Sequence, residues 1–224
     1  ESLIFFLIYC DYDTQKVAIE ICSSLHHDYI LSSLLNTKKV KSAIISIISQ
    51  DDLEDIRLIP AIHLLNNFLE KCPLECTKKF VTKKGCNKLV PFLIKFINEG
   101  AFHLKVEAGV LLARTIQKIP SHFTIPFFNE LSPSPDETIW GLLDSIKVIF
   151  DVNNSDQLLI EMMVAIAGIC DELSLYYNPE TLLEINQNFN STEIWRQLVE
   201  LAENDSEQIS ALAKQIIDYF HLDE

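Results

Sequence analysis

Residues 80–116 read FVTKKGCNKLVPFLIKFINEGAFHLKVEAGVLLARTI and contain two apolar segments with a short polar break between them. In the second segment, apolar side chains recur at steps of three and four residues, as at Val106, Val110 and Ala113. This spacing is typical of one buried face of an α-helix, whereas a strand would alternate. The break at residues 98–100, Asn-Glu-Gly, ends the first segment. The stretch therefore predicts two consecutive helices.

The same arrangement recurs along the chain: an apolar helix, a polar break, and a longer helix. Ala18, Ala61 and Ala108, matching small residues of three longer helices, are 43 and 47 residues apart. Helical repeats of about 40–47 residues stack into extended arrays. The sequence therefore predicts an all-α chain of stacked repeats. The expected helix pairs span residues 3–9 and 15–25, 40–49 and 53–71, 89–97 and 104–119, 140–150 and 156–173, and 194–202 and 206–220.

Two other helical architectures are alternatives to stacked repeats. A coiled coil requires a seam with a period of 3.5 residues, and the breaks every 10–18 residues exclude it. A globular helix bundle is the open alternative, because helix hairpins alone do not determine a stacking order.

One repeat carries a resemblance to a known family. Phe80–Leu93 resembles the first helix of an armadillo repeat leading into the second, and Glu107–Ile116 resembles the third helix. Gly85 would suit the sharp turn in that motif, because glycine tolerates a positive φ. HEAT repeats are similar, so the other repeats fit either family.

The resemblance implies a right-handed α-solenoid of about five armadillo- or HEAT-like repeats, with the first repeat incomplete. We expect one domain over residues 1–224, and we expect it to be part of a longer protein. The approximate repeats are residues 1–28, 29–73, 74–122, 123–178 and 179–224.

The charge distribution excludes some partners and suggests others. The 224 residues carry a net charge of −14, of which residues 1–105 contribute +1 and residues 106–224 contribute −15. Arginine occurs only at Arg57, Arg114 and Arg196, so the paired contacts with phosphate that nucleic-acid binding uses are scarce. We expect no binding to nucleic acid, and a protein or peptide partner that is basic or of mixed charge toward the acidic second half.

The sequence offers no set of residues for catalysis. It has no Gly-rich phosphate loop and no metalloprotease or nucleophile-elbow motif, so we expect no enzymatic activity, cofactor or metal. Cys72, Cys76 and Cys86 are interpreted as buried thiols rather than ligands. Residues 3–9 are too few for a membrane anchor, and we expect an intracellular protein, cytoplasmic or nuclear, without membrane insertion.

The resemblance also implies where a partner would bind. Peptide-binding armadillo proteins hold an extended ligand against their stacked third helices, on a concave surface, with Trp and Asn side chains four residues apart. His63 and Asn67 are the closest match here, although no equivalent position carries Trp. We expect His63, Asn67, Lys105 and Arg114 to contact the ligand.

A lysine cluster is a second candidate site. Lys78, Lys79, Lys83, Lys84 and Lys88 are interpreted as a candidate basic docking patch for an acidic segment or a phosphate. The alternative is a solvated face without a ligand.

The function predicted from these observations is a non-enzymatic protein–protein interaction scaffold that binds a partner segment on the concave surface of its third helices. One alternative is a regulator that clamps a folded partner domain, like an Hsp70 exchange factor of this architecture. The other is a structural spacer within a larger multi-domain protein.

Overall fold

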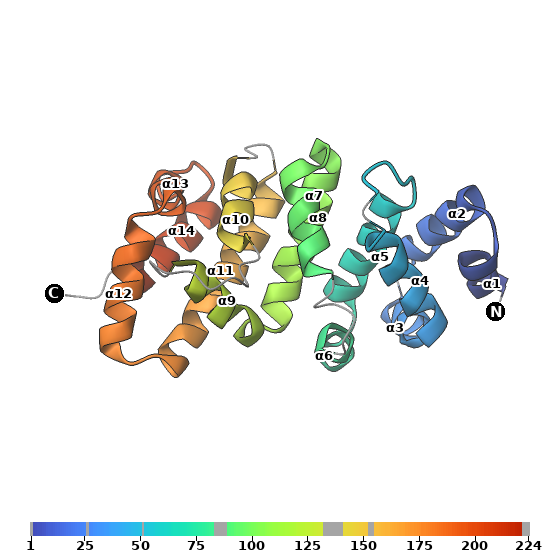
Figure 1. Cartoon of the computed structure of the whole chain (residues 1–224), viewed down its shortest axis with the longest axis horizontal. Helices are drawn as coiled ribbons and strands as arrows, with labels where there is room; N and C mark the ends of the chain where they lie inside the picture. Colours follow the sequence, from blue (N-terminus) through green and yellow to red (C-terminus); the bar gives the residue numbers. More distant parts are fainter. Residues whose placement is uncertain are drawn as a thin grey trace. The chain divides into compact units, whose positions relative to one another are not determined.

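A computed structural model describes residues 2–25, 27–50, 52–82, 89–131, 141–151 and 155–220. These residues form α-helices joined by turns, and no β-strand occurs among them (Figure 1), which confirms the all-α prediction. The chain divides into two compact units, residues 1–118 and 119–224, which we describe separately. None of the helices described combines the length and the apolar character that crossing a membrane requires.

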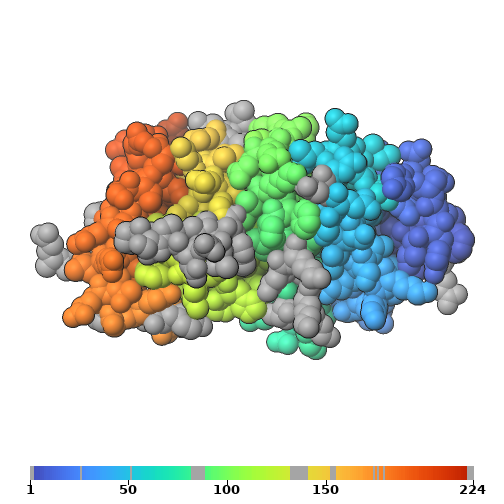
Figure 2. Space-filling view, viewed as in Figure 1, coloured from blue at the N-terminus to red at the C-terminus, as the bar shows by residue number. Residues whose placement is uncertain are grey.

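The described residues of unit 1 form one pair of helices followed by two triplets. In each group the last helix, which we call the third helix, packs against the third helix of the next group: α2 contacts α5, and α5 contacts α8. Figure 2 shows the same order at the surface, where bands of colour from dark blue to green follow the sequence. The helices are α1 (Ser2–Tyr9), α2 (Tyr12–Ser23), α3 (Asp28–Asn36), α4 (Lys38–Ile48), α5 (Leu58–Lys71), α6 (Leu74–Thr82), α7 (Val90–Glu99) and α8 (Phe102–Lys118).

In unit 2, the part of the chain that the structure describes forms two triplets of helices. Its third helices, α11 and α14, pack against each other, and so do the second helices, α10 and α13. The repeat boundaries expected from the sequence fall within two residues of the starts of α3, α6, α9 and α12. The helices are α9 (Ser121–Leu131), α10 (Leu142–Asp151), α11 (Asp156–Tyr176), α12 (Pro179–Asn190), α13 (Glu193–Leu201) and α14 (Glu207–Phe220).

The core of each unit is built from the apolar stripes of its helices. In α5, Ala61, Leu65 and Phe68 recur at helical steps and are almost completely buried. Phe68 meets the ring of Phe80 from α6 edge to face, with 5.0 Å between ring centroids. In unit 2 the corresponding aromatic contact stacks Phe189 on Phe220. Each such buried side chain contributes about 1.5–3 kcal/mol to folding, so the core supplies most of the stabilising free energy.

Capping side chains determine where several helices begin. Ser155 accepts a hydrogen bond from the Leu158 N–H at the start of α11, and Asn178 accepts one from the Thr181 N–H at the start of α12. These bonds satisfy N–H groups that have no partner within the helix. The polar break expected at residues 151–155 therefore ends in a side chain that starts the next helix.

The sequence interpretation of α5 was wrong at its start. The helix begins at Leu58, five residues later than the expected Leu53. Asp52 and Asp55 accept hydrogen bonds from the N–H groups of Glu54 and Arg57, at 3.0 and 2.8 Å. Because these bonds favour turns over a continuous helix, the segment before Leu58 does not join α5.

The end of α7 depends on a glycine. The Gly100 N–H donates to the Phe96 carbonyl at 3.0 Å, immediately after the helix. A Cβ at position 100 would lie 2.5 Å from that same oxygen, so a larger residue would force the turn apart. The positive-φ turn expected at Gly85 falls on a residue outside the described ranges.

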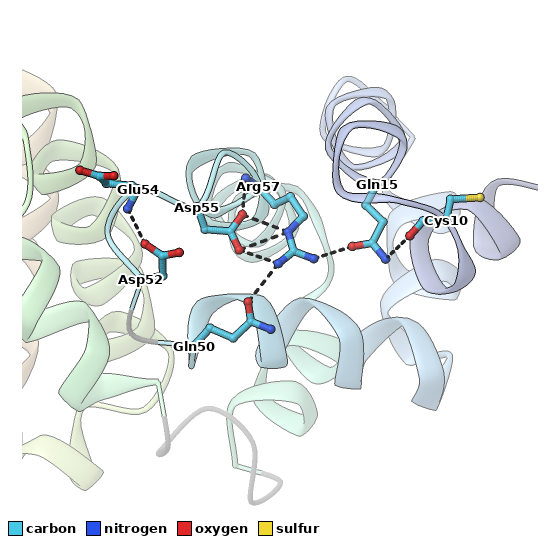
Figure 3. Close-up of polar contacts among 7 residues, drawn as sticks. All are labelled: Cys10, Gln15, Gln50, Asp52, Glu54, Asp55 and Arg57. Carbon is cyan, nitrogen blue, oxygen red and sulfur yellow. Dashed lines mark hydrogen bonds and ion pairs between the residues drawn. The ribbon is translucent and has the colours of Figure 1, made fainter.

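A buried arginine joins the first two repeats (Figure 3). The Arg57 side chain bonds both carboxylate oxygens of Asp55, with the shortest contact 2.6 Å from Nη2 to Oδ2. It also donates to the side-chain oxygens of Gln15 in α2, at 2.6 Å, and Gln50, at 3.0 Å. The Tyr12 ring covers the guanidinium at 3.6 Å. Arg57 therefore links α2, the end of α4 and the start of α5.

The pair has a defined protonation state. Hydrogen bonds from Arg57 hold the pKa of Asp55 below its ordinary value, and the same bonds raise the pKa of Arg57. Both side chains are at most 4% exposed, so neither has water as a ready substitute partner.

Removing the Asp55 charge should destabilise unit 1. We expect Asp55→Asn to lower the free energy of unfolding by about 2–3 kcal/mol at pH 7, because Arg57 is left without its counter-ion. A lowered pKa makes this contribution complete above the unfolded value of about 3.9 and lost as pH falls through the folded value. The difference between the two proteins, measured by urea denaturation, should therefore shrink below about pH 4.

Asp52→Asn is the matched control. Asp52 is exposed and makes a turn bond that asparagine can also accept, so a loss below about 1 kcal/mol is expected. Equal losses in the two variants would contradict the assigned role of Arg57 and Asp55.

Candidate binding surface

The outward side of each third helix is the surface on which the sequence places a ligand. On α5, His63, Asn67 and Glu70 are separated by four and three residues, so they share one side of the helix. Its opposite side is the apolar stripe in the core. We call the outward sides of α2, α5 and α8 the unit 1 third-helix face. The outward sides of α11 and α14 are the unit 2 third-helix face.

Of the four residues expected to contact a ligand, His63 is exposed and Asn67 is half-buried. The Asn67 side chain donates from Nδ2 to the Ser23 carbonyl of α2 at 2.7 Å, across 44 residues of sequence. The structure thus brings His63 and Asn67 to one surface, but it uses the Asn67 amide to connect two repeats.

Arg114 is only 6% exposed and lies between two third helices. From α8, its Nη1 donates to the Asn66 carbonyl and to Glu70 Oε2 of α5, both at 3.0 Å. Asn66 also links the two helices in the other direction: from α5, its Nδ2 donates to Glu107 Oε2 of α8 at 2.9 Å and to the Glu107 carbonyl at 3.1 Å. The amide oxygen of Asn66 has no hydrogen-bond partner among the described residues. Arg114 therefore has a structural role, and its contact with a ligand stays a prediction.

Lys105 lies close to the turn between α7 and α8. It is half-buried, and its Nζ donates to the Asn98 carbonyl at 2.9 Å. In the lysine cluster, Lys78 and Lys79 are exposed on α6. The other three members, Lys83, Lys84 and Lys88, lie outside the described residues.

The unit 2 third-helix face is acidic. Helix α11 carries four acidic residues and no lysine or arginine. Glu161, Gly168 and Glu172 are separated by seven and four residues and share one side of the helix. Val164, 39% exposed, adds an apolar side chain beside them. The face therefore offers carboxylates around an apolar surface, which suits a ligand with basic side chains on apolar stems.

Helix α14 is tied to this surface. The Tyr219 hydroxyl donates to the Asp171 carboxylate of α11. Tyr219 also lines a shallow hollow of about 410 Å³ on α14, so the hollow adjoins the acidic helix. Its lining residues are Ala211, Lys214, Gln215, Asp218 and Tyr219.

The thiols of Cys22 and Cys72 are buried, that of Cys76 is half-buried, and Cys86 lies outside the described residues. Burial raises the pKa of the Cys22 thiol to about 11 and is the main cause of the same shift at Cys72. At neutral pH both remain protonated, which makes them poor nucleophiles and poor metal ligands. In the part of the chain that the structure describes, no three His, Cys, Asp or Glu side chains gather around a common point.

The contacts of Asn67 and Arg114 predict a loss of stability on truncation. We expect Asn67→Ala and Arg114→Ala each to lower the free energy of unfolding by about 1–3 kcal/mol, because each removes side-chain hydrogen bonds that join two third helices. Chemical denaturation of the purified variants measures this difference.

His63→Ala is the control on the same face. His63 is exposed, so its replacement should change stability by less than about 0.5 kcal/mol. If His63→Ala cost as much as Arg114→Ala, the inter-repeat bonds would not be the cause of the loss.

Comparison with known proteins shows a likeness of fold. No family model matches the sequence, and no curated protein matches it. A designed armadillo repeat protein in complex with the peptide (KR)4 is similar over 98% of both chains, with a TM-score of 0.54 and 15% identity. An engineered protein from the Northeast Structural Genomics Consortium gives 0.57 and 15%, covering 98% of this chain and 97% of the other. Another designed armadillo repeat protein gives 0.52 and 12% over 98% of both.

These likenesses confirm the armadillo-like repeat fold expected from residues 80–116. At identities of 12–15% they establish the fold and carry no information on the ligand of this chain.

Proposed function

We propose that this armadillo-like chain is a non-enzymatic binding scaffold that holds an extended, basic segment of a partner protein along its third helices. The observation that carries the proposal is helix α11, which has no basic residue and on which the half-buried Glu161 and Glu172 lie on the same side. Stacked repeats present such a surface continuously, so the affinity is spread over several helices.

Electrostatics favours a basic ligand for unit 2. Residues 106–224 carry a net charge of −15, which raises the local concentration of cationic segments and speeds their association. Long lysine and arginine side chains can place their charge on Glu161 and Glu172 while their stems cover the exposed surface of Val164. The hollow beside Tyr219 provides room for one further side chain.

A structural neighbour supports the choice of ligand. The designed armadillo repeat protein of similar fold is in complex with (KR)4, a peptide of alternating lysine and arginine. The likeness concerns the fold, so (KR)4 serves here as a probe of the acidic face.

Unit 1 has a third-helix face of its own, which we propose as a separate contact surface. His63 and Glu70 are exposed side chains with hydrogen-bonding capacity on the same side of α5. Asn67 and Arg114 fix the spacing of α2, α5 and α8 through the bonds described above. We propose that Asn67 and Arg114 determine the positions of the side chains that bind the ligand, and that they can also contact the ligand themselves.

Binding of fluorescently labelled (KR)4, measured by anisotropy, tests the proposal. We expect Glu161→Gln with Glu172→Gln to weaken binding by about tenfold, because two ion pairs are lost on a partly solvated surface. The matched control is Glu180→Gln with Glu184→Gln, which removes the same charge from exposed positions of α12, a first helix. This control should change the Kd by less than about twofold.

The salt dependence of binding distinguishes the proposed ion pairs from an apolar contact. Raising the salt concentration from 50 to 300 mM should weaken binding of (KR)4 to the unaltered protein, since exposed ion pairs are screened. Failure of the unaltered protein to bind (KR)4, or equal weakening by the α11 and α12 variants, would overturn the proposal.

A further inference from the structure

A second cavity lies in unit 1, away from the third helices. It has a volume of about 340 Å³ and is formed where the end of α3 and the first turns of α4 meet α6. Its lining residues are Leu35, Asn36, Lys38, Lys41, Lys79 and Phe80. The helices that form it are first and second helices of the repeats, so the cavity is separate from the binding surface proposed above.

The cavity joins lysines that the sequence keeps apart. Lys79 belongs to the lysine cluster noted in the sequence, whereas Lys38 and Lys41 belong to the preceding repeat. The packing of α6 beside α4 brings all three to one opening. Among the residues that the structure describes, three lysines and no acidic residue line it, so these side chains make the potential inside positive.

Lys41 is held in a fixed position by Phe80. Its Nζ donates to the Phe80 carbonyl at 3.2 Å and lies 4.2 Å from the centroid of the Phe80 ring. Both contacts orient the ammonium group at the wall of the cavity and limit the entropy lost when a ligand binds. The other two lysines, Lys38 and Lys79, are exposed and lie at the opening.

Besides its lysines, the cavity is lined by apolar side chains and one amide side chain. Leu35 and Phe80 provide apolar wall, and the Asn36 side chain provides hydrogen-bond donors and an acceptor. At about 340 Å³ the cavity is at the small end of ligand sites, which suits one or two side chains rather than a large cofactor.

We propose that this cavity binds an acidic peptide segment of a partner protein, with a carboxylate placed among Lys38, Lys41 and Lys79. Each lysine acts as a compact point charge on a flexible stem, so the set can hold a carboxylate in more than one orientation. The site gives the chain two ligand surfaces of opposite preference. It is independent of the proposed function at the third helices.

Fluorescently labelled octaglutamate is the probe for this site. We expect the unaltered protein to bind it, and Lys38→Glu with Lys79→Glu to weaken binding by at least about tenfold. Both residues are exposed and glutamate is well tolerated in helices, so the variant should fold, which circular dichroism checks. The milder Lys38→Gln with Lys79→Gln should give an intermediate loss.

Lys147→Glu with Lys214→Glu is the matched control, because it makes the same change of net charge at exposed positions of unit 2. It should alter octaglutamate binding by less than about twofold. Binding of (KR)4 should survive Lys38→Glu with Lys79→Glu, which separates this proposal from the first.

Three results would overturn the inference. The first is that the unaltered protein does not bind octaglutamate. The second is that Lys38→Glu with Lys79→Glu and the control Lys147→Glu with Lys214→Glu weaken binding equally, so that only the net charge matters. The third is that a phosphoserine peptide binds through Lys38 and Lys79 while octaglutamate does not, which would make the cavity a reader of phosphorylation.

Discussion

The stacking of each third helix on the next is the interaction on which the rest of the structure depends. Packing of α2 on α5, α5 on α8, and α11 on α14 buries the apolar stripes of neighbouring repeats. Each of these contacts also carries a polar connection: Asn67 with Ser23, Arg114 with Asn66, and Tyr219 with Asp171. The apolar contacts supply free energy, while the directional bonds determine the register of one helix on the next. The remaining side of each third helix is the one on which we propose that the ligand binds.

The sequence predicts the fold because helical periodicity and repeat length are local properties. The spacing of Val110, Ala113 and Ile116 in α8 is visible without knowing its neighbours. The role of Arg57 is not visible, because its partner Gln15 is 42 residues away and is chosen by the packing of two repeats. The sequence did not predict the late start of α5 for another reason: acidic residues are common both in turns and at helix starts.

The candidate site was predictable in position and less so in chemistry. The four-residue spacing of His63 and Asn67 identified the outward side of α5. It did not show that the Asn67 side chain donates a hydrogen bond to a backbone carbonyl of another repeat, because every residue has a carbonyl group and the sequence cannot tell which one lies nearby. The lysine cavity was hidden for a related reason: Lys41 and Lys79 meet only after α4 and α6 pack. The acidic character of α11, in contrast, can be read directly from its residues.

The central claim is that the third helices both hold the repeats together and present the ligand surface. Hydrogen–deuterium exchange of the full chain, with and without (KR)4, tests it most directly because it reports protection helix by helix. The account predicts added protection of amides in α11 and α14, with α9, α10, α12 and α13 unchanged. Protection that falls mainly on these first and second helices, or that spreads evenly over the chain, would contradict it.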